Sequence, residues 1–246
     1  MGPTHLVRVF DGELTQLSTG LLRMGGLAER QLALSLESLD RLDVDAARRA
    51  IETDRQVDAY EASITEQATR MLAVRQPLAG DLRAVMGSLK LAADLERVAD
   101  YAANIAKRTL ALAAAPRLHP VQGVPRMGQM VLGMVKDILD ALAREDVELA
   151  LDVWHADGAV DELYNSLFRE LLDTMRSDPR VIGSCTHLLF VAKNLERVGD
   201  HATNMAEEIH FIVRGSRLDM DRPKSDITPS LTLEPDPAGH NEDQDR

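Results

Sequence analysis

A twelve-residue stretch that occurs twice decides the fold of this chain. It reads LERVADYAANIA at residues 95–106 and LERVGDHATNMA at residues 195–206, and eight of the twelve positions are identical at a shift of 100 residues. In and just before the first copy, apolar residues recur every three or four positions, which is the spacing of one face of an α-helix. These residues are Leu91, Leu95, Val98, Ala102 and Ile105. Each copy is therefore predicted to be a helix that turns this face toward a core.

A second match shows that the repeat extends well beyond this stretch. The segment DRQVD at residues 54–58 aligns with DGAVD at residues 157–161 at a shift of 103, and Pro77 lies opposite Pro179. The two shifts differ only through loop lengths, so both halves contain three helices in the same order. We predict an all-α fold of two pseudo-symmetric three-helix bundles in tandem. The predicted parts are a first bundle (1–115), a proline-rich linker (116–125), a second bundle (126–218) and a disordered acidic tail (219–246).

The composition agrees with an all-helical fold. Aromatic residues make up only 3% of the chain, and helix formers dominate over the β-branched and aromatic runs that strands prefer. Six long helices are predicted from the 3.6-residue periodicity and from the positions of Gly and Pro. They cover about residues 10–42, 45–74, 77 or 81 to 114, 124–144, 146–176 and 178–214. Gly215 is predicted to end the last helix.

Charge and cysteine content limit the classes of function. The 28 Lys and Arg residues against 40 Asp and Glu residues give a net charge of −12, which argues against binding nucleic acid or an anionic membrane surface. The longest purely apolar run has six residues, whereas a spanning helix needs roughly 20, so no membrane insertion is expected. The single cysteine, Cys185, fits a reducing compartment, and a cytoplasmic location is predicted.

The repeat also carries carboxylates at helical spacing. Glu96 and Asp100 lie four residues apart, Glu196 and Asp200 repeat them, and a similar acidic stripe lies on the preceding helix of each half. If the two helices are antiparallel neighbours, the stripes face each other and their carboxylates repel. A divalent cation or iron would relieve that repulsion through oxygen ligands. The predicted metal ligands are Asp54, Asp58, Glu61, Glu96, Asp100, Asp157, Asp161, Glu196 and Asp200.

Other interpretations stay open at this point. Acids at this spacing are commonly a solvated helix face, and His201 is expected on the helix surface. A metal-dependent oxidase or hydrolase is suggested by Glu207-x-x-His210, which has the spacing of a di-iron motif. The matching positions in the first half are Lys107 and Leu110, and no nucleophile–base pair is found, so we predict no catalysis. A metal-buffering protein would bind far more than a few ions per chain.

The ordered set of motifs resembles the PhoU family, the phosphate-transport accessory and regulatory proteins of bacteria. The resemblance covers about residues 5–215. Beside both copies of D-x-x-V-D and of E-R-x-x-D-x-A-x-N, it rests on FDGEL at residues 10–14 and PLAGDLR at residues 77–83. It implies two three-helix bundles and, in some members, clusters of metal ions, often iron, on the acidic stripes. The second half departs from the pattern, because Asp-Leu-Arg is absent after Pro179 and Tyr164 stands where Glu61 stood.

The resemblance also implies partners. It implies a cytosolic protein that binds a phosphate ABC transporter ATPase and a sensor histidine kinase, and that represses phosphate-starvation genes when phosphate is plentiful. Two similar bundles would let one chain bridge two partners, and we expect a homodimer as a further assembly. The residues predicted to bind partner proteins are Arg97, Asn104, Arg197 and Asn204.

Overall fold

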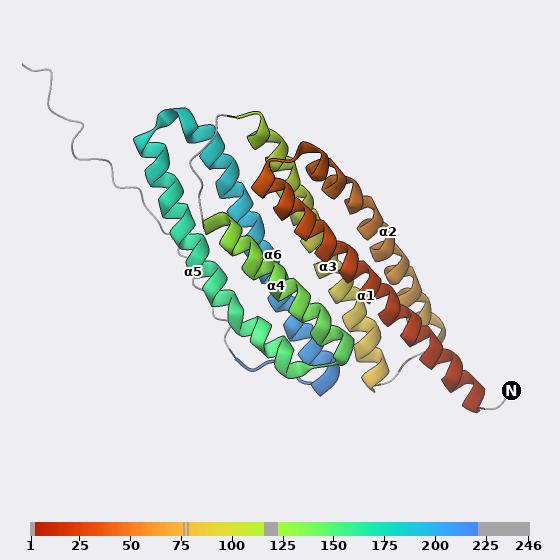
Figure 1. Cartoon of the computed structure of the whole chain (residues 1–246). Coiled ribbons are helices and arrows are strands. Elements are labelled where there is room, and N and C mark those ends of the chain that lie inside the picture. The colour runs from red at the N-terminus through yellow and green to blue at the C-terminus, as the bar shows by residue number, and fades with distance from the viewer. Residues whose placement is uncertain (1–2, 76, 78, 116–122, 221–246) are drawn as a thin grey trace, which may run out of the picture.

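Six long helices make up the described part of the chain (Figure 1). The computed structural model describes residues 3–75, 77, 79–115 and 123–220, and this part of the chain contains no strand. The helices are α1 (Pro3–Arg41), α2 (Val44–Arg75), α3 (Ala79–Ala113), α4 (Gly123–Arg144), α5 (Val147–Ser177) and α6 (Ile182–Arg214). The predicted all-α class is therefore confirmed for the described residues.

Helices α2 to α5 begin and end within two residues of their predicted bounds. The start of α1 was predicted wrongly: the helix begins at Pro3, seven residues before Phe10. Proline suits the first turn of a helix, because the backbone N–H that it lacks would have no hydrogen-bond partner within the helix there. Most of the predicted linker and almost all of the predicted disordered tail, residues 116–122 and 221–246, lie outside the described residues.

The two ends of α6 follow from local chemistry. A single 3-10 turn, Pro179–Val181, precedes the helix, and the Asp178 carboxylate accepts the backbone N–H of Arg180 at 3.0 Å. The helix proper therefore begins at Ile182, slightly later than predicted. Gly215 ends it with a φ of 77°. That left-handed conformation costs glycine little, so the predicted helix end is confirmed.

The sequence repeat is also a repeat of backbone geometry. Leu42 and Glu145, which are 103 positions apart, both have a φ of 52° in the turn that closes α1 and α4 respectively. The next residues, Asp43 and Asp146, each donate a backbone hydrogen bond of 2.9 Å to the carbonyl five residues earlier. Both carboxylates then accept backbone N–H groups from the first turn of the following helix. The same capped turn therefore starts α2 and α5.

Helices α3 and α6 run antiparallel along the boundary between the two halves (Figure 1). Near one end, Lys90 Nζ lies 2.8 Å from the Glu208 carboxylate. Near the other end, the Arg108 guanidinium lies 4.4 Å from the centre of the Phe190 ring. Positions 90 and 190, and positions 108 and 208, are counterparts in the repeat. The two contacts are thus exchanged by an approximate two-fold axis, which makes the predicted pseudo-symmetry explicit.

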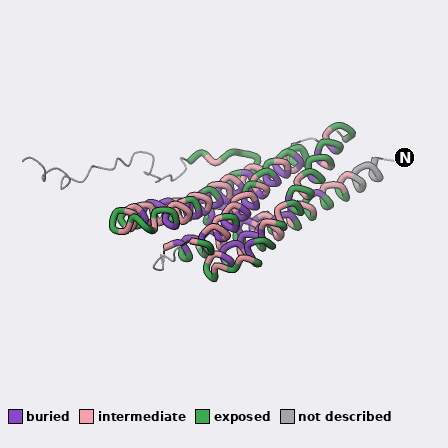
Figure 2. The backbone as a smooth tube through the Cα atoms, turned by 90° about the horizontal axis from the view of Figure 1, so that it is seen from above, coloured by how far each residue is buried: buried purple, intermediate pink, exposed green. Residues whose placement is uncertain are grey.

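The two bundles share one core. A single hydrophobic cluster contains residues from all six helices, and α1 also contacts α4 across the boundary. Buried residues lie on the faces that the helices turn toward one another, and exposed residues lie outside (Figure 2). The apolar face predicted from the repeat is fully buried. Its residues Leu91, Leu95, Val98, Ala102 and Ile105 all have 0% exposure.

Candidate acidic pocket

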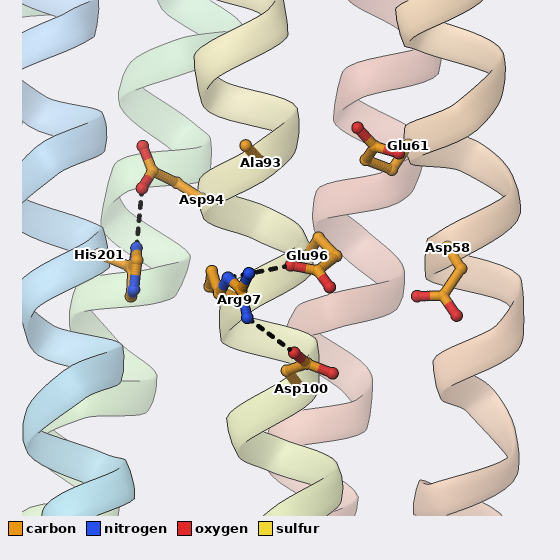
Figure 3. Close-up of a pocket in the computed structure, with 8 residues that line it drawn as sticks. All are labelled: Asp58, Glu61, Ala93, Asp94, Glu96, Arg97, Asp100 and His201. Carbon is orange, nitrogen blue, oxygen red and sulfur yellow. Dashed lines mark hydrogen bonds and ion pairs between the residues drawn. The ribbon is translucent and has the colours of Figure 1, made fainter.

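An open pocket of about 650 Å³ lies between α2 and α3 and reaches α6 (Figure 3). Two pairs of carboxylates line it, Asp58 and Glu61 from α2 and Glu96 and Asp100 from α3, and Asp94 of α3 is a fifth. Each pair lies within two turns of its own helix, so the side chains share a face. The two acidic stripes of the first half, apart from Asp54, therefore face a common space, as was expected if their helices were antiparallel neighbours.

The carboxylates in this pocket disfavour one another's charged forms. Burial first, and then Asp54, Asp100 and Glu61, raise the pKa of Asp58 above its ordinary value of 3.8. Burial, followed by Asp100, likewise raises the pKa of Glu96 above 4.5. Partial desolvation and like charge are the two causes that keep protons on carboxyl groups. A cation placed among these groups would favour their charged forms and so lower their pKa values.

Arg97 supplies part of the missing positive charge from within the chain. Its guanidinium lies 3.4 Å from the Glu96 carboxylate and donates a hydrogen bond of 3.3 Å to Asp100. The Arg97 side chain is 56% exposed, so solvent screens these contacts and they contribute little to stability. One turn further along α3, Asn104 accepts a hydrogen bond of 3.3 Å from Lys107. Arg97 therefore lies within the pocket, whereas Asn104 lies beyond it.

Asp54 is held away from the pocket by a buried amide that the sequence analysis missed. Gln31 on α1 is 1% exposed, and its side-chain N–H groups donate to the Asp54 carboxylate at 3.2 Å and to the Ala99 carbonyl at 3.1 Å. Asp54 is not among the lining residues, although its charge still acts on Asp58. A single polar residue among apolar neighbours has no periodic signature, so its role could not be found from the pattern.

His201 and Asp94 connect the pocket to the other half of the molecule. His201 Nδ1 on α6 lies 2.7 Å from the Asp94 carboxylate on α3, and both side chains are about four-fifths buried. The expectation of a surface histidine was therefore wrong. His201 also lies beside its repeat counterpart Tyr101, with ring centres 5.7 Å apart. The signal available in sequence was that both copies of the repeat place a ring at this position.

The carboxylates of the second half, which we call together the second acidic stripe, have a different environment. Asp157, Asp161 and Glu196 are 2%, 3% and 6% exposed, between α5 and α6, and Asp200 is partly buried. Lys193 Nζ lies 2.8 Å from the Glu196 carboxylate. Three of these four acids therefore lie inside the molecule, whereas four of the five in the first half line an open pocket.

The other residues predicted to bind partners lie on α6. Arg197 is exposed and its guanidinium lies 5.7 Å from the centre of the Tyr101 ring, so it reaches across to α3. Asn204 is partly buried. The contact between Arg197 and Tyr101 therefore lies at the boundary between the halves. It is also near the pocket, because Tyr101 contacts His201, which lines the pocket.

The residues of the di-iron alternative are engaged elsewhere. Glu207 accepts a hydrogen bond of 3.1 Å from the Trp154 indole, and His210 Nδ1 lies 3.0 Å from the Ser216 carbonyl. Within the described residues, no three His, Cys, Asp or Glu side chains already converge as a metal site. Carboxylates on flexible side chains suit a hard divalent cation or iron, and those of the first pocket would have to rotate to hold one. Among the described helices, none has the length and apolarity of a membrane span.

The fold and the pocket together define the class of this protein: a duplicated six-helix protein with an acidic pocket on its first half. The profile of the PhoU domain matches residues 21–109 and 124–209, one match in each half. The chain belongs to the PhoU family.

Named relatives and solved structures agree with this assignment. A phosphate-specific transport system accessory protein PhoU homolog from Caulobacter vibrioides is 46% identical, over 91% of this chain and 97% of that protein. The homolog of the same description from Rhizobium meliloti is 44% identical, over 94% and 98%. The crystal structure of PhoU from Pseudomonas aeruginosa is similar with a TM-score of 0.81 at 39% identity, over 84% of this chain and 100% of that one. The phosphate transport system regulatory protein PhoU from Streptococcus pneumoniae gives a TM-score of 0.80 at 28% identity, over 86% and 100%.

Proposed function

We propose that this protein is a cytosolic regulatory adaptor of phosphate uptake and of phosphate-starvation signalling. The names of its relatives support an accessory role in phosphate transport. In this proposal the chain binds the ATPase of a phosphate ABC transporter and a sensor histidine kinase, and it represses the starvation response when phosphate is plentiful. The observation that carries the proposal is the open acidic pocket, where two carboxyl groups have raised pKa values.

The pocket favours a positively charged partner. Membrane proteins concentrate Lys and Arg in their cytosolic loops, and an acidic face would attract such segments and select among them. Arg97 and Arg197 flank the acids at the boundary between the halves, where they would contact acidic groups of the same partner. Binding through this face would explain regulation without any catalytic step.

A divalent cation or iron would bind the same carboxylates before or together with a partner. Asp58, Glu61, Glu96 and Asp100 would hold it, since they line one pocket from two helices. A bound cation neutralises the repelling carboxylates and links α2 to α3 through oxygen ligands. A metal-buffering function predicts instead that a purified chain binds many ions. Elemental analysis of the purified chain distinguishes this function from a single cation site.

Charge reversal on the exposed pocket tests the adaptor function. The double variant Glu96→Lys with Asp100→Lys is expected to release a phosphate-starvation reporter from repression in phosphate-rich medium. The same variant is expected to recover less transporter ATPase and kinase in a pull-down. Glu162→Lys on the exposed side of α5 is the matched control and should change neither readout.

One further measurement makes the result decisive. A thermal melt must show that the double variant remains folded. Intact repression by a folded double variant would exclude the pocket as the regulatory surface. Glu196 is unsuitable for this experiment, because it is buried beside Lys193 and a second lysine there would leave buried charges unpaired.

A further inference from the structure

Both halves of the molecule bring several carboxylates together on neighbouring helices, but the surroundings of these carboxylates differ. Each places an Asp-x-x-x-Asp pair on one helix against a Glu-x-x-x-Asp pair on the next. In the first half Asp58 is exposed and Glu96 and Asp100 are partly exposed, around an open pocket. In the second half Asp161 and Glu196 are buried. A buried carboxylate is costly unless it is paired with a positive charge, and the second half contains such a charge beside Glu196.

Lys193 is that charge. It lies three residues before Glu196 on the same face of α6, and its Nζ atom is 2.8 Å from the Glu196 carboxylate. The ammonium also lies 5.0 Å from the centre of the Tyr164 ring on α5, within the distance at which a cation is attracted to an aromatic face. Lys193 therefore connects α6 to α5 beside the acids of the second half.

The repeat counterparts of these residues show that the difference is systematic. Position 93, which corresponds to Lys193, is an alanine that lines the open pocket. Position 61, which corresponds to Tyr164, is a glutamate that lines it too. The first half thus has one more acid and no lysine at these two positions. The second half has a lysine and an aromatic ring to receive it.

We infer that Lys193 is a built-in counter-ion that closes the second acidic stripe to metal ions, so that the chain binds metal at its first half alone. The part concerning the first half rests on the proposed function. The part concerning the second half rests on the Lys193 contacts. The stripe of Asp157, Asp161, Glu196 and Asp200 accordingly does not fit a resident metal ion in this chain, although its sequence spacing is that of the first half.

Binding of Mn²⁺ to the full chain tests the inference. Ions per chain are measured by equilibrium dialysis with elemental analysis, beside a thermal melt of each variant. Lys193→Ala is expected to add about one bound Mn²⁺ per chain, and adding Glu196→Gln to it should remove that ion again. Lys136→Ala, at an exposed lysine on α4, is the matched control and should leave the count unchanged. A folded Lys193→Ala chain that gains no Mn²⁺ would overturn the inference.

A second pair of variants does not depend on the folding of Lys193→Ala. Asp161→Asn with Glu196→Gln should leave Mn²⁺ binding of the otherwise unchanged chain as it was, whereas Asp58→Asn with Glu96→Gln should abolish it. Loss of Mn²⁺ in the first pair would overturn the inference. If the unchanged chain binds no Mn²⁺ at all, the proposed cation at the first half fails, while a gain in Lys193→Ala still supports the role of Lys193.

Discussion

Replacing Asp58 by Asn should stabilise the metal-free protein, because it removes a charge from a cluster of like charges. The substitution preserves the shape of the side chain. After burial, the neighbours that raise the pKa of Asp58 are Asp54, Asp100 and Glu61. Like-charge pairs on exposed helix faces cost a few tenths of a kcal/mol each, so the three together cost about 1 kcal/mol. In a chain of this size that corresponds to an increase in Tm of about 2–4 °C.

The effect should depend on pH with a definite sign. The pKa of Asp58 is higher in the folded state than its ordinary value of 3.8, so the folded state takes up the proton first as the pH falls. The penalty is therefore fully present above the folded-state pKa and disappears as the pH falls through it. The melting temperatures of the variant and the unchanged protein should differ at pH 7 and converge toward pH 4. High salt should also reduce the difference.

Melts followed by circular dichroism at low salt with a chelator measure this directly. Glu162→Gln is the matched control, since Glu162 is exposed on α5 and no charged residue lies three or four positions away. Added Mn²⁺ should reverse the order, because the unchanged protein retains all four carboxylates proposed to hold the cation and gains more from the ion. An Asp58→Asn variant that melts at or below the unchanged protein in chelator at pH 7 would refute the reasoning.

Three further substitutions test the scaffold around the pocket. Asp146→Ala should cost about 1 kcal/mol in free energy of unfolding, because it leaves the Leu149 N–H without its cap. Urea denaturation measures this cost, and a change under about 0.3 kcal/mol would contradict the capping role. Leu95→Ala should cost about 2–5 kcal/mol in the same assay, since Leu95 has 0% exposure, and a smaller loss would mean that the core collapses around the cavity. His201→Phe should cost about 1–2 kcal/mol in free energy of unfolding, because it leaves a mostly buried Asp94 without its partner. If Asp94→Asn costs the same and the double variant costs no more than either single variant, the two residues are coupled as described. Costs that add up in the double variant would show that they are not coupled.

Periodicity could predict much of this fold, because a helix that turns one face to a core repeats its apolar residues at a fixed spacing. The buried face around Leu95 and Val98 and the bounds of α2 to α5 follow from that rule. The same rule placed Asp58 and Glu96 on acidic stripes that would face each other if their helices were antiparallel neighbours. It could not predict the hydrogen bond from the Gln31 amide to Asp54. That contact joins two helices, and only packing sets how they are rotated relative to each other.

Burial of the acids was the least predictable property of the site. Glu96 and Glu196 occupy the same place in the same motif, yet their side chains are 27% and 7% exposed. The motif itself is nearly unchanged between the halves, so it cannot account for the difference. What differs is the surroundings: an alanine against a lysine three residues earlier on the same helix, and a glutamate against a tyrosine on the neighbouring helix.

That comparison indicates which feature of a duplicated acidic motif determines its environment. Residues three apart on a helix share a face, so a lysine three positions before the glutamate can reach its carboxylate wherever the helix packs. Lys193 does so at 2.8 Å, while Ala93 leaves the corresponding space to the pocket. The carboxylates alone show only that positive charge is needed. The residue one turn earlier determines whether the chain provides that charge itself or leaves room for a cation or a basic partner.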